Sequence, residues 1–444
     1  MATPKDDGLH VVIIGGGLAG LATALSTKLA NPSHSVTVLE SVKELQEVGA
    51  GLQITPNGTR LLSAWGLIPQ LTPLAAIPTT LSVHRYTGTT LLAHEPDLQS
   101  RVLSRYGHPF WDLHRVDLQQ ALVARCTALG VTIRLDSAVS RVDLSAPSPT
   151  VHLARGGTVS GSVVILCDGL WSSLRSQFLG RPTPALPTGD LAYRLVLPLA
   201  SLPPDDAELR ALVSQPTVRF WFGPGAHAVG YSVRGGEAYN LVLLCPDDMP
   251  GGVSKAAGDS EAMRAAFAGW DPLLHRLLAA VEGETVQKWK LMWLDALEQW
   301  AEEGGRLFMA GDCCHPMLPY LAQGANSSLE DGAVLGALLG KVAGEGDRAG
   351  LERVARVYQG VRKGRGERIQ REGFLQRDVN HLEDGEAQTL RDEVFARNLG
   401  KEEVEGGFPS RWTCPDVQGF LWGYDAYADA ERGWKEDLER EAKL

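Results

Sequence analysis

The chain has 444 residues, 44% hydrophobic and 21% charged, which is typical of a soluble globular protein large enough for two or three domains. Its formal net charge of −11 at pH 7 excludes general binding to nucleic acid or an anionic membrane, because most of the surface would repel a polyanion. Any anionic ligand must therefore meet positive groups placed locally.

The amino-terminal residues 1–10 are polar, and three glycines interrupt the apolar run after them, so neither a signal peptide nor a membrane span is predicted. We therefore expect a cytoplasmic protein. The cysteines show neither a C-x-x-C pair nor the spacing of a secreted disulfide framework. No metal site is predicted, because Cys313, Cys314 and His315 are consecutive, whereas zinc ligands are usually separated by two to four residues.

A strand, a glycine turn and a helix are predicted at the start of the chain. Residues 10–14 are mostly β-branched, and leucines recur at helical spacing from residue 18. Between them, Gly15, Gly17 and Gly20 fit the pattern G-x-G-x-x-G. In that pattern the first glycine permits the tight bend, the second admits a pyrophosphate and the third lets the helix pack on the strand.

A second predicted strand, residues 35–39, ends at Glu40, which follows Gly20 by 20 residues. An acid at this distance is expected to bind a ribose hydroxyl. The order of strand, glycine turn, helix, strand and acid predicts a dinucleotide-binding fold. It does not distinguish NAD from FAD.

Short alternating strands separated by turn residues are predicted between residues 181 and 290. In the run "HAVGYSV", His227, Val229 and Tyr231 fall on one face, so an imidazole and a phenol can reach one small ring. Tyr193 and Arg194 fall on opposite faces of their strand, and either could face the cleft. Arg194 there would hold a carboxylate or phenolate.

The stretch "GDCCHPMLPYLAQGANSSLEDGAVLG", residues 311–336, follows an apolar strand and leads into a predicted helix. A loop rich in glycine and alanine at a helix start offers backbone N–H donors to developing negative charge, as a reduced flavin ring presents. Farther along, residues 361–377 are basic but interleaved with glutamates, so a solvated helix face is expected there.

Two motifs carry a resemblance to a known family: "GDCCHPMLPYLAQGAN" at residues 311–326 and "DGLWSSLR" at residues 168–175. With the tail segments "HLEDGEAQTLRD" and "LWGYDAYADAE", they make the chain resemble the aromatic-hydroxylating flavoprotein monooxygenases, in the salicylate hydroxylase-like branch with its fungal members. Where the family commonly has Gly-Gln-Gly, this chain has Ala322-Gln323-Gly324.

The resemblance implies an α/β fold like that of para-hydroxybenzoate hydroxylase, a Rossmann-like FAD-binding domain with an inserted antiparallel-sheet substrate domain and a C-terminal helical region. The expected FAD-binding parts are residues 1–180, with a substrate-side insertion near 76–104, and residues 291–345. The substrate domain would be 181–290 and the helical region 346–444.

The resemblance also implies roles for individual residues. His227 and Tyr231 would hold and deprotonate an aromatic hydroxyl, with Arg194 as a third catalytic residue and Tyr193 and Pro319 in the substrate pocket. The implied cofactor-binding residues are Gly15, Gly17, Gly20, Glu40, Gly49, Ala50, Gly51, Arg115, Asp168, Asp312, Gly324, Ala325 and Asn326. For Arg115, a surface ion pair with Asp112 or Asp117 is an alternative.

The implied activity is hydroxylation of a phenolic or hydroxybenzoate-type aromatic through a flavin C4a-hydroperoxide, with FAD as cofactor, NADH or NADPH as transient reductant and O₂ as co-substrate. Decarboxylation could accompany it. A fungal polyketide or indole intermediate is an alternative substrate, and a non-catalytic flavin-binding regulatory protein is an alternative of another class. We expect no nucleic-acid or membrane partner, and a monomer or homodimer.

Overall fold

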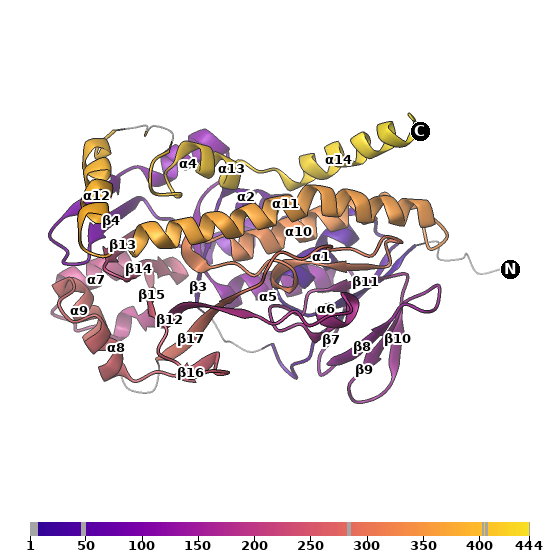
Figure 1. The fold of residues 1–444 in the computed structure, drawn as a ribbon, viewed down its shortest axis with the longest axis horizontal. Coiled ribbons are helices and arrows are strands. Elements are labelled where there is room, and N and C mark those ends of the chain that lie inside the picture. The colour runs from indigo at the N-terminus through magenta and orange to yellow at the C-terminus, as the bar shows by residue number, and fades with distance from the viewer. Residues whose placement is uncertain (1–7, 46–49, 282–285, 402–403, 405–406, 444) are drawn as a thin grey trace.

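The computed structural model describes residues 8–45, 50–281, 286–401, 404 and 407–443. Two large sheets organise these residues, and the long helix α11 (Arg348–Asn380) runs past both (Figure 1). Within this described part, no helix is both long enough and apolar enough to cross a membrane.

The first large sheet has five parallel strands in the order β18-β11-β1-β2-β7. Its strands are β1 (His10–Ile14), β2 (Ser35–Leu39), β7 (Thr132–Arg134), β11 (Val163–Leu166) and β18 (Leu307–Met309). The central strands β1 and β11 are continuous apolar runs because both faces of this parallel sheet are buried. This is the dinucleotide-binding arrangement that the glycine turn predicts.

Helix α1 (Leu18–Ala30) packs closely against α10 (Gly324–Leu339). Small residues make the contact possible: a Cβ on Gly332 would lie 2.6 Å from backbone atoms of Ala22 and Thr23, and one on Gly336 would lie 2.4 Å from Oγ of Ser26. The start of α1 and the start of α10 are thereby fixed relative to each other. Helix α5 (Arg115–Ala128) also packs on α1.

The second large sheet has eight strands in the order β16-β17-β12-β15-β14-β13-β4-β5. Its bounds are β4 (Thr80–Arg85), β5 (Leu91–Glu95), β12 (Leu186–Pro198), β13 (Thr217–Gly223), β14 (Ala226–Val233), β15 (Ala238–Pro246), β16 (Lys255–Ala257) and β17 (Gln287–Trp293). All neighbours are antiparallel except β13 and β4, so the sheet is mixed rather than purely antiparallel. The parallel pair arises because β4 and β5 come from the segment near residues 76–104.

One face of the eight-stranded sheet is covered by short helices, α7 (Ala207–Ser214), α8 (Ser260–Ala266) and α9 (Pro272–Ala279). Leu191, Tyr193 and Leu195 of β12 pack with them in one apolar cluster. The other face is therefore left to meet the rest of the molecule, and it is the face that bears Arg194.

Smaller elements connect these parts. A two-stranded ribbon pairs β3 (Gly51–Ile54) with β6 (Trp111–His114), and a three-stranded antiparallel sheet contains β8 (Val139–Asp143), β9 (Thr150–Leu153) and β10 (Thr158–Ser160). The short helices are α2 (Pro56–Ala64), α3 (Ile68–Leu71), α4 (Leu98–Tyr106) and α6 (Ser173–Phe178).

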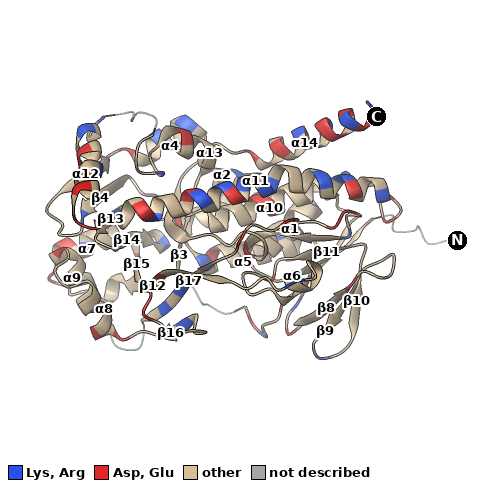
Figure 2. Cartoon of the chain, in the orientation of Figure 1, with Lys and Arg blue, Asp and Glu red and all other residues tan. Residues whose placement is uncertain are grey.

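The C-terminal region is helical, as predicted, with α11 followed by α12 (Glu386–Asn398), α13 (Pro415–Trp422) and α14 (Ala426–Glu441). Acidic and basic residues alternate along α11 and α14 (Figure 2). The prediction of a solvated helix face at residues 361–377 is only partly correct, because Arg362 and Arg365 are buried. Lys363 forms a partly buried i,i+4 ion pair with Glu367 at 2.7 Å.

Candidate active site

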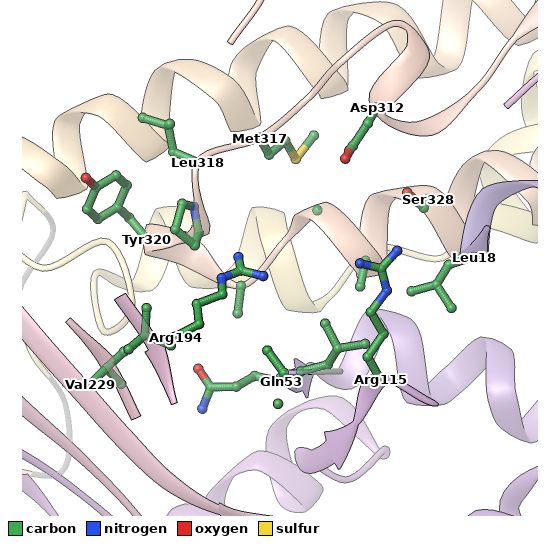
Figure 3. Close-up of a pocket in the computed structure, with 18 of the residues that line it drawn as sticks. Leu18, Gln53, Arg115, Arg194, Val229, Asp312, Met317, Leu318, Tyr320 and Ser328 are labelled. Carbon is green, nitrogen blue, oxygen red and sulfur yellow. The ribbon is translucent and has the colours of Figure 1, made fainter. Parts of the chain in front are cut away.

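A cavity of about 300 Å³ is bounded by the start of α1, the ribbon strand β3, the open face of the eight-stranded sheet and the segment that leads into α10. Arg115 and Arg194 extend into it, and Asp312 and Met317 face them from the opposite wall (Figure 3). Predicted site residues in its lining are Gly17, Ala50, Gly51, Arg115, Arg194, His227, Tyr231, Asp312, Pro319, Gly324 and Ala325.

The glycine turn has the geometry that its pattern predicts. Gly15 has a φ of +107°, and a Cβ there would lie 2.3 Å from the carbonyl oxygen of Cys167. A Cβ on Gly20 would lie 2.0 Å from the carbonyl oxygen of Gly15, so only glycine allows this helix to start so close to the strand. Gly17 faces open space, which leaves room for a ligand at the start of α1.

Glu40 lies beside this turn, where its Oε2 accepts the backbone N–H of Gly16 at 2.7 Å. With Asp168, it lines a second, smaller cavity that adjoins the glycine turn. The Oδ1 atom of Asp168 is buried without a hydrogen-bond partner among the described residues, and burial raises the pKa of this carboxyl. A buried carboxyl oxygen without a hydrogen-bond partner is placed to meet a polar ligand.

Gly49 falls outside the described residues. Gly51 packs against the eight-stranded sheet: its N–H donates to Oδ1 of Asn240 at 2.7 Å, and a Cβ there would lie 2.6 Å from the ring of Tyr231. Glycine at this position therefore lets β3 close one side of the cavity. Next to it, Gln53 donates to Oδ1 of Asp112 at 3.0 Å.

Arg115 begins α5, and no ion pair of the described residues includes it. The alternative role of Arg115, a surface ion pair with Asp112 or Asp117, is not what the structure shows. Asp112 is buried and hydrogen-bonded to Gln53, and Asp117 lies 3.8 Å from Arg234. The Arg115 guanidinium instead occupies the cavity wall. There it adds positive charge opposite Asp312.

The segment before α10 brings polar and backbone groups to the cavity. Asp312 is exposed to the cavity on one side and enclosed by protein on the other. This enclosure raises the pKa of its carboxyl, while the nearby His315, Arg115 and Arg194 act in the opposite direction and lower it. Gly324 and Ala325 lie in the first turn of α10, whose unpaired N–H groups make a helix start favourable for negative charge.

Asn326 does not line the cavity, in contrast to the prediction that it is a cofactor-binding residue. Its side chain is fully buried behind the wall, where Oδ1 accepts the N–H of Thr55 and Nδ2 donates to the carbonyl oxygens of Gln53 and Ala322. Only its backbone neighbours, Gly324 and Ala325, reach the lining. The Asn326 side chain therefore connects α10 to β3 through hydrogen bonds.

Arg194, His227 and Tyr231 share the open face of the eight-stranded sheet. Arg194 pairs in register with Val242, and Val242 pairs with Val229, so these positions lie side by side across three strands. His227 and Tyr231 flank Val229 two residues to either side and point the same way. The predicted convergence of an imidazole and a phenol on one space is present, and the guanidinium of Arg194 joins them.

The prediction that Tyr193 lies in the substrate pocket is wrong. It lies on the opposite face of β12, where it is buried in the cluster under α8 and α9 and its ring lies 5.4 Å from Nζ of Lys288. The alternation of a strand makes the two assignments exclusive: because Arg194 faces the cavity, Tyr193 cannot.

Burial dominates the electrostatics of these three side chains. It lowers the pKa of Arg194 and lowers that of His227 well below its ordinary value of 6.5, while it raises the pKa of Tyr231. Nε of Arg194 is buried without a hydrogen-bond partner among the described residues. A neutral imidazole therefore lies beside a guanidinium whose donors are not all used.

A buried charged network behind the cavity was not predicted. Asp331 lies 2.5 Å from Nε2 of His315 and 2.8 Å from Arg362, and Glu330 lies 2.8 Å from both Arg362 and Arg365. The N–H of Gly311 also donates to Asp331 at 2.8 Å. Two adjacent acids in an otherwise apolar helix were the available signal, because buried carboxylates need partners.

Three groups of this region, Cys314, His315 and Asp331, have ligand atoms within 4.8 Å of one another. The Asp331 oxygens are already bound by His315, Arg362 and the N–H of Gly311, so the geometry is that of a hydrogen-bonded network. Burial raises the pKa of the Cys313 and Cys314 thiols, which disfavours the thiolate that redox chemistry needs.

The family described as an FAD binding domain matches residues 8–369. The chain belongs to this FAD-binding domain family. FAD-dependent monooxygenase OpS4 of Beauveria bassiana (strain ARSEF 2860) is 49% identical over 427 residues, which cover 95% of this chain and 96% of that protein. The 3-amino-4-hydroxybenzoate 2-monooxygenase PtnB3 of Streptomyces platensis is 32% identical over 386 residues, covering 86% and 91%.

A solved salicylate hydroxylase substrate complex has the same fold, with a TM-score of 0.76 and 21% identity over 97% of this chain and 98% of that one. The predicted fold class, enzyme class and cofactor are thus confirmed. This member of the FAD-binding domain family is an FAD-dependent monooxygenase that uses O₂ and a nicotinamide reductant. The alternative of a non-catalytic regulatory protein is not supported.

The residues present fit FAD. Gly17 leaves open space at the helix start, Asp168 has an unused buried oxygen, and Arg115 reaches into the cavity. These groups lie along two adjoining cavities, both of which Gly17 and Gly169 line. An elongated, charged dinucleotide requires such a path with separate donors and acceptors.

Proposed function

We propose that this monooxygenase hydroxylates the ring of a small phenolic acid of the hydroxybenzoate type. The observation that carries the proposal is the grouping of Arg194, His227 and Tyr231 on one wall of the cavity that the FAD-binding elements also line. A cation and an acid–base pair directed at one space suit an aromatic ring that bears a carboxylate and a hydroxyl.

In this proposal, Nε2 of His227 accepts the proton of the substrate hydroxyl, because the described hydrogen bonds of this ring use only Nδ1. A phenolate ring is richer in electrons than a neutral phenol and so reacts faster with an electrophilic oxygen. The Tyr231 hydroxyl holds the substrate oxygen, and Arg194 binds the carboxylate and stabilises negative charge. Pro319, Val229 and Val242 limit the shape of the space and exclude water.

We also propose which residues hold FAD. Gly15, Gly17 and Gly20 bring the helix start to the pyrophosphate, and Glu40 binds the adenosine ribose. Arg115, Asp168 and Asp312 provide polar contacts along the chain of the cofactor, while Ala50, Gly51, Gly324 and Ala325 present backbone to the flavin ring. When bound, FAD supplies hydride acceptance from NAD(P)H and the activation of O₂.

The substrate class rests on the relatives as well as on the cavity. PtnB3 acts on 3-amino-4-hydroxybenzoate, as its name says, whereas the name of OpS4 specifies no substrate. A hydroxyl placed beside the ring carboxylate would allow decarboxylation to accompany hydroxylation. Because the lining also contains Phe220, Met317 and Trp412, a larger fungal polyketide or indole intermediate is the second candidate.

We further propose that the protein acts in the cytoplasm as a monomer or homodimer. NADH and NADPH are both candidate reductants, and no nucleic-acid or membrane partner is proposed, consistent with the net charge of −11.

The experiment that tests the function follows NADH and NADPH oxidation by the FAD-loaded protein against a panel of hydroxybenzoates, phenols and indoles. Hydrogen peroxide and organic product are measured together. The proposal expects a hydroxybenzoate to accelerate oxidation with about one hydroxylated product per nucleotide. Acceleration that yields only hydrogen peroxide, or acceleration by indoles alone, would contradict the proposed substrate class.

A further inference from the structure

A second histidine lies directly behind His227. Nδ1 of His227 lies 2.7 Å from Nε2 of His381, and the two ring centroids are 4.9 Å apart. His381 follows the last residue of α11, 154 positions from His227 in sequence. The backbone is fixed there too, because the N–H of Gly225 donates to the carbonyl oxygen of His381 at 3.1 Å.

Both imidazoles are neutral near pH 7. Burial lowers the pKa of His227 well below its ordinary value, and burial together with the charge of Arg377 lowers that of His381 to about 4. Two neutral imidazoles share a single N–H in such a contact. The tautomer of one ring therefore determines the tautomer of the other.

The groups that surround the pair leave its hydrogen bond undisturbed. The hydroxyl of Tyr320 donates to Asp190 at 2.7 Å, and Arg377 donates to Asp378 at 2.8 Å and lies 3.9 Å from Asp190. The ring of Tyr320 packs on both imidazoles, with centroid distances of 5.2 Å to His227 and 5.7 Å to His381. No described hydrogen bond connects these groups to either histidine ring.

The two histidines differ in exposure. His227 is 2% exposed and lines the cavity, whereas His381 is only partly buried and belongs to the surface turn after α11. One end of the pair meets the substrate space and the other end approaches solvent. If these two side chains only filled space in the fold, titratable rings would not be needed at both positions.

We propose that His381 is a positioning residue that sets the tautomer of His227 and passes its proton to solvent. This inference rests on the proposed function of His227. Nε2 of His227 takes the proton of the substrate hydroxyl, breaking that O–H bond, while Nδ1 gives its own proton to Nε2 of His381. His381 then releases its Nδ1 proton to water, so one proton leaves the site and the bound phenolate keeps the electron pair.

The reverse path serves the end of the reaction. When the hydroxylated ring needs a proton back, water protonates Nδ1 of His381, Nε2 returns its proton to Nδ1 of His227, and Nε2 of His227 gives one to the product oxygen. Both rings then hold their starting tautomers. Neither histidine carries a charge at rest, which is consistent with burial of the pair.

The test uses a chromophoric probe, 4-hydroxy-3-nitrobenzoate, whose phenolate has its own visible absorbance. The FAD-loaded protein is mixed rapidly with the neutral phenol below the pKa of the probe, without NAD(P)H, and the rate at which bound phenolate appears is recorded. The variants are His381→Gln, which can still accept a hydrogen bond from His227 but cannot pass a proton, and His275→Gln on α9 as a matched control.

We expect His381→Gln to bind the probe with unchanged affinity but to form phenolate at least ~10-fold more slowly, and added imidazole to restore the rate. His275→Gln should behave like the parent. If His381→Gln does not fold, His381→Asn replaces it, because Asn is accepted at helix ends.

An unchanged rate in His381→Gln, or a slow rate that imidazole does not restore, would overturn the relay while leaving the proposed function intact. If the unmodified protein binds the probe without forming phenolate, the proposed function of His227 fails and the relay fails with it.

Discussion

Oδ1 of Asn326 accepts the backbone N–H of Thr55 at 3.2 Å, and this contact ties the start of α10 to the end of β3. The same side chain donates to the carbonyl oxygen of Gln53 at 3.0 Å. Glycine is required nearby, because a Cβ on Gly58 would lie 2.1 Å from Oδ1 of Asn326. Two walls of the cavity are thus held together by one buried amide.

Asn326→Ala should therefore destabilise the protein by about 2–4 kcal/mol, since it leaves buried backbone groups of Thr55 and Gln53 unpaired. Ser327→Ala is the matched control: its buried hydroxyl has no hydrogen-bond partner among the described residues, so its loss should cost less than about 1 kcal/mol. Urea unfolding of the three proteins measures the difference. Equal effects of the two substitutions would show that Asn326 is not a tie.

Ala322 is a non-glycine residue with a φ of +52°, at the position where the family commonly has the first glycine of Gly-Gln-Gly. A left-handed conformation costs alanine about 1 kcal/mol relative to glycine. We expect Ala322→Gly to raise the free energy of unfolding by up to about 1 kcal/mol. Ala337→Gly, inside α10, should lower it by about 1 kcal/mol. A destabilised Ala322→Gly protein would contradict this account of the loop.

The sequence predicts those parts of the site whose geometry is local. The glycine turn at Gly15 is complete within a few residues. His227 and Tyr231 are four residues apart, and because a strand alternates its side chains, this even spacing is enough to place them on one face. The sequence alone could not decide whether Tyr193 or Arg194 faces the cavity, because this depends on the register in which Arg194 lies beside Val242.

Contacts between distant segments were not predictable in the same way. His381 lies 154 residues from the ring that it contacts, and the basic composition around Arg362 concealed that one side of α11 is buried. The helical spacing of the buried residues Arg362, Gly366 and Ile369 was a usable signal, once the paired acids Glu330 and Asp331 were recognised as needing partners.

The acid stability of the protein should depend on Asp331. Burial raises the pKa of this carboxyl, but the charges of His315 and Arg362 outweigh burial and lower it to about 2. A carboxyl with a lowered pKa in the folded state binds fewer protons than in the unfolded chain, so its contribution to stability is complete above about pH 4 and lost toward pH 2.

Asp331→Asn should therefore be much less stable than the parent near neutral pH, and the gap should narrow as the pH falls from about 4 toward 2. Urea unfolding across this range measures the gap, with Asp205→Asn as an exposed control that should follow the parent throughout. A gap that stays constant with pH would show that the charge of Asp331 is not the cause.

Arg194 should discriminate between acidic and neutral substrates. Arg194→Met keeps most of the side-chain length but loses the charge and the paired donors, so the KM for a hydroxybenzoate should rise about 10- to 100-fold. The KM for the corresponding phenol without a carboxylate should change by less than about threefold. Steady-state kinetics with both compounds, after FAD content is matched, tests this. Equal losses for the two would mean that Arg194 does not bind the carboxylate.

In the proposed reaction, an oxygen atom of O₂ enters the ring of a substrate held by Arg194, His227 and Tyr231. The most direct test supplies ¹⁸O₂ to the FAD-loaded protein with NAD(P)H and the most active hydroxybenzoate, and determines the product mass. We expect one ¹⁸O atom in the new hydroxyl of each product molecule and none when the label is in water. A product that takes its oxygen from water, or no labelled product while NAD(P)H is consumed, would contradict it.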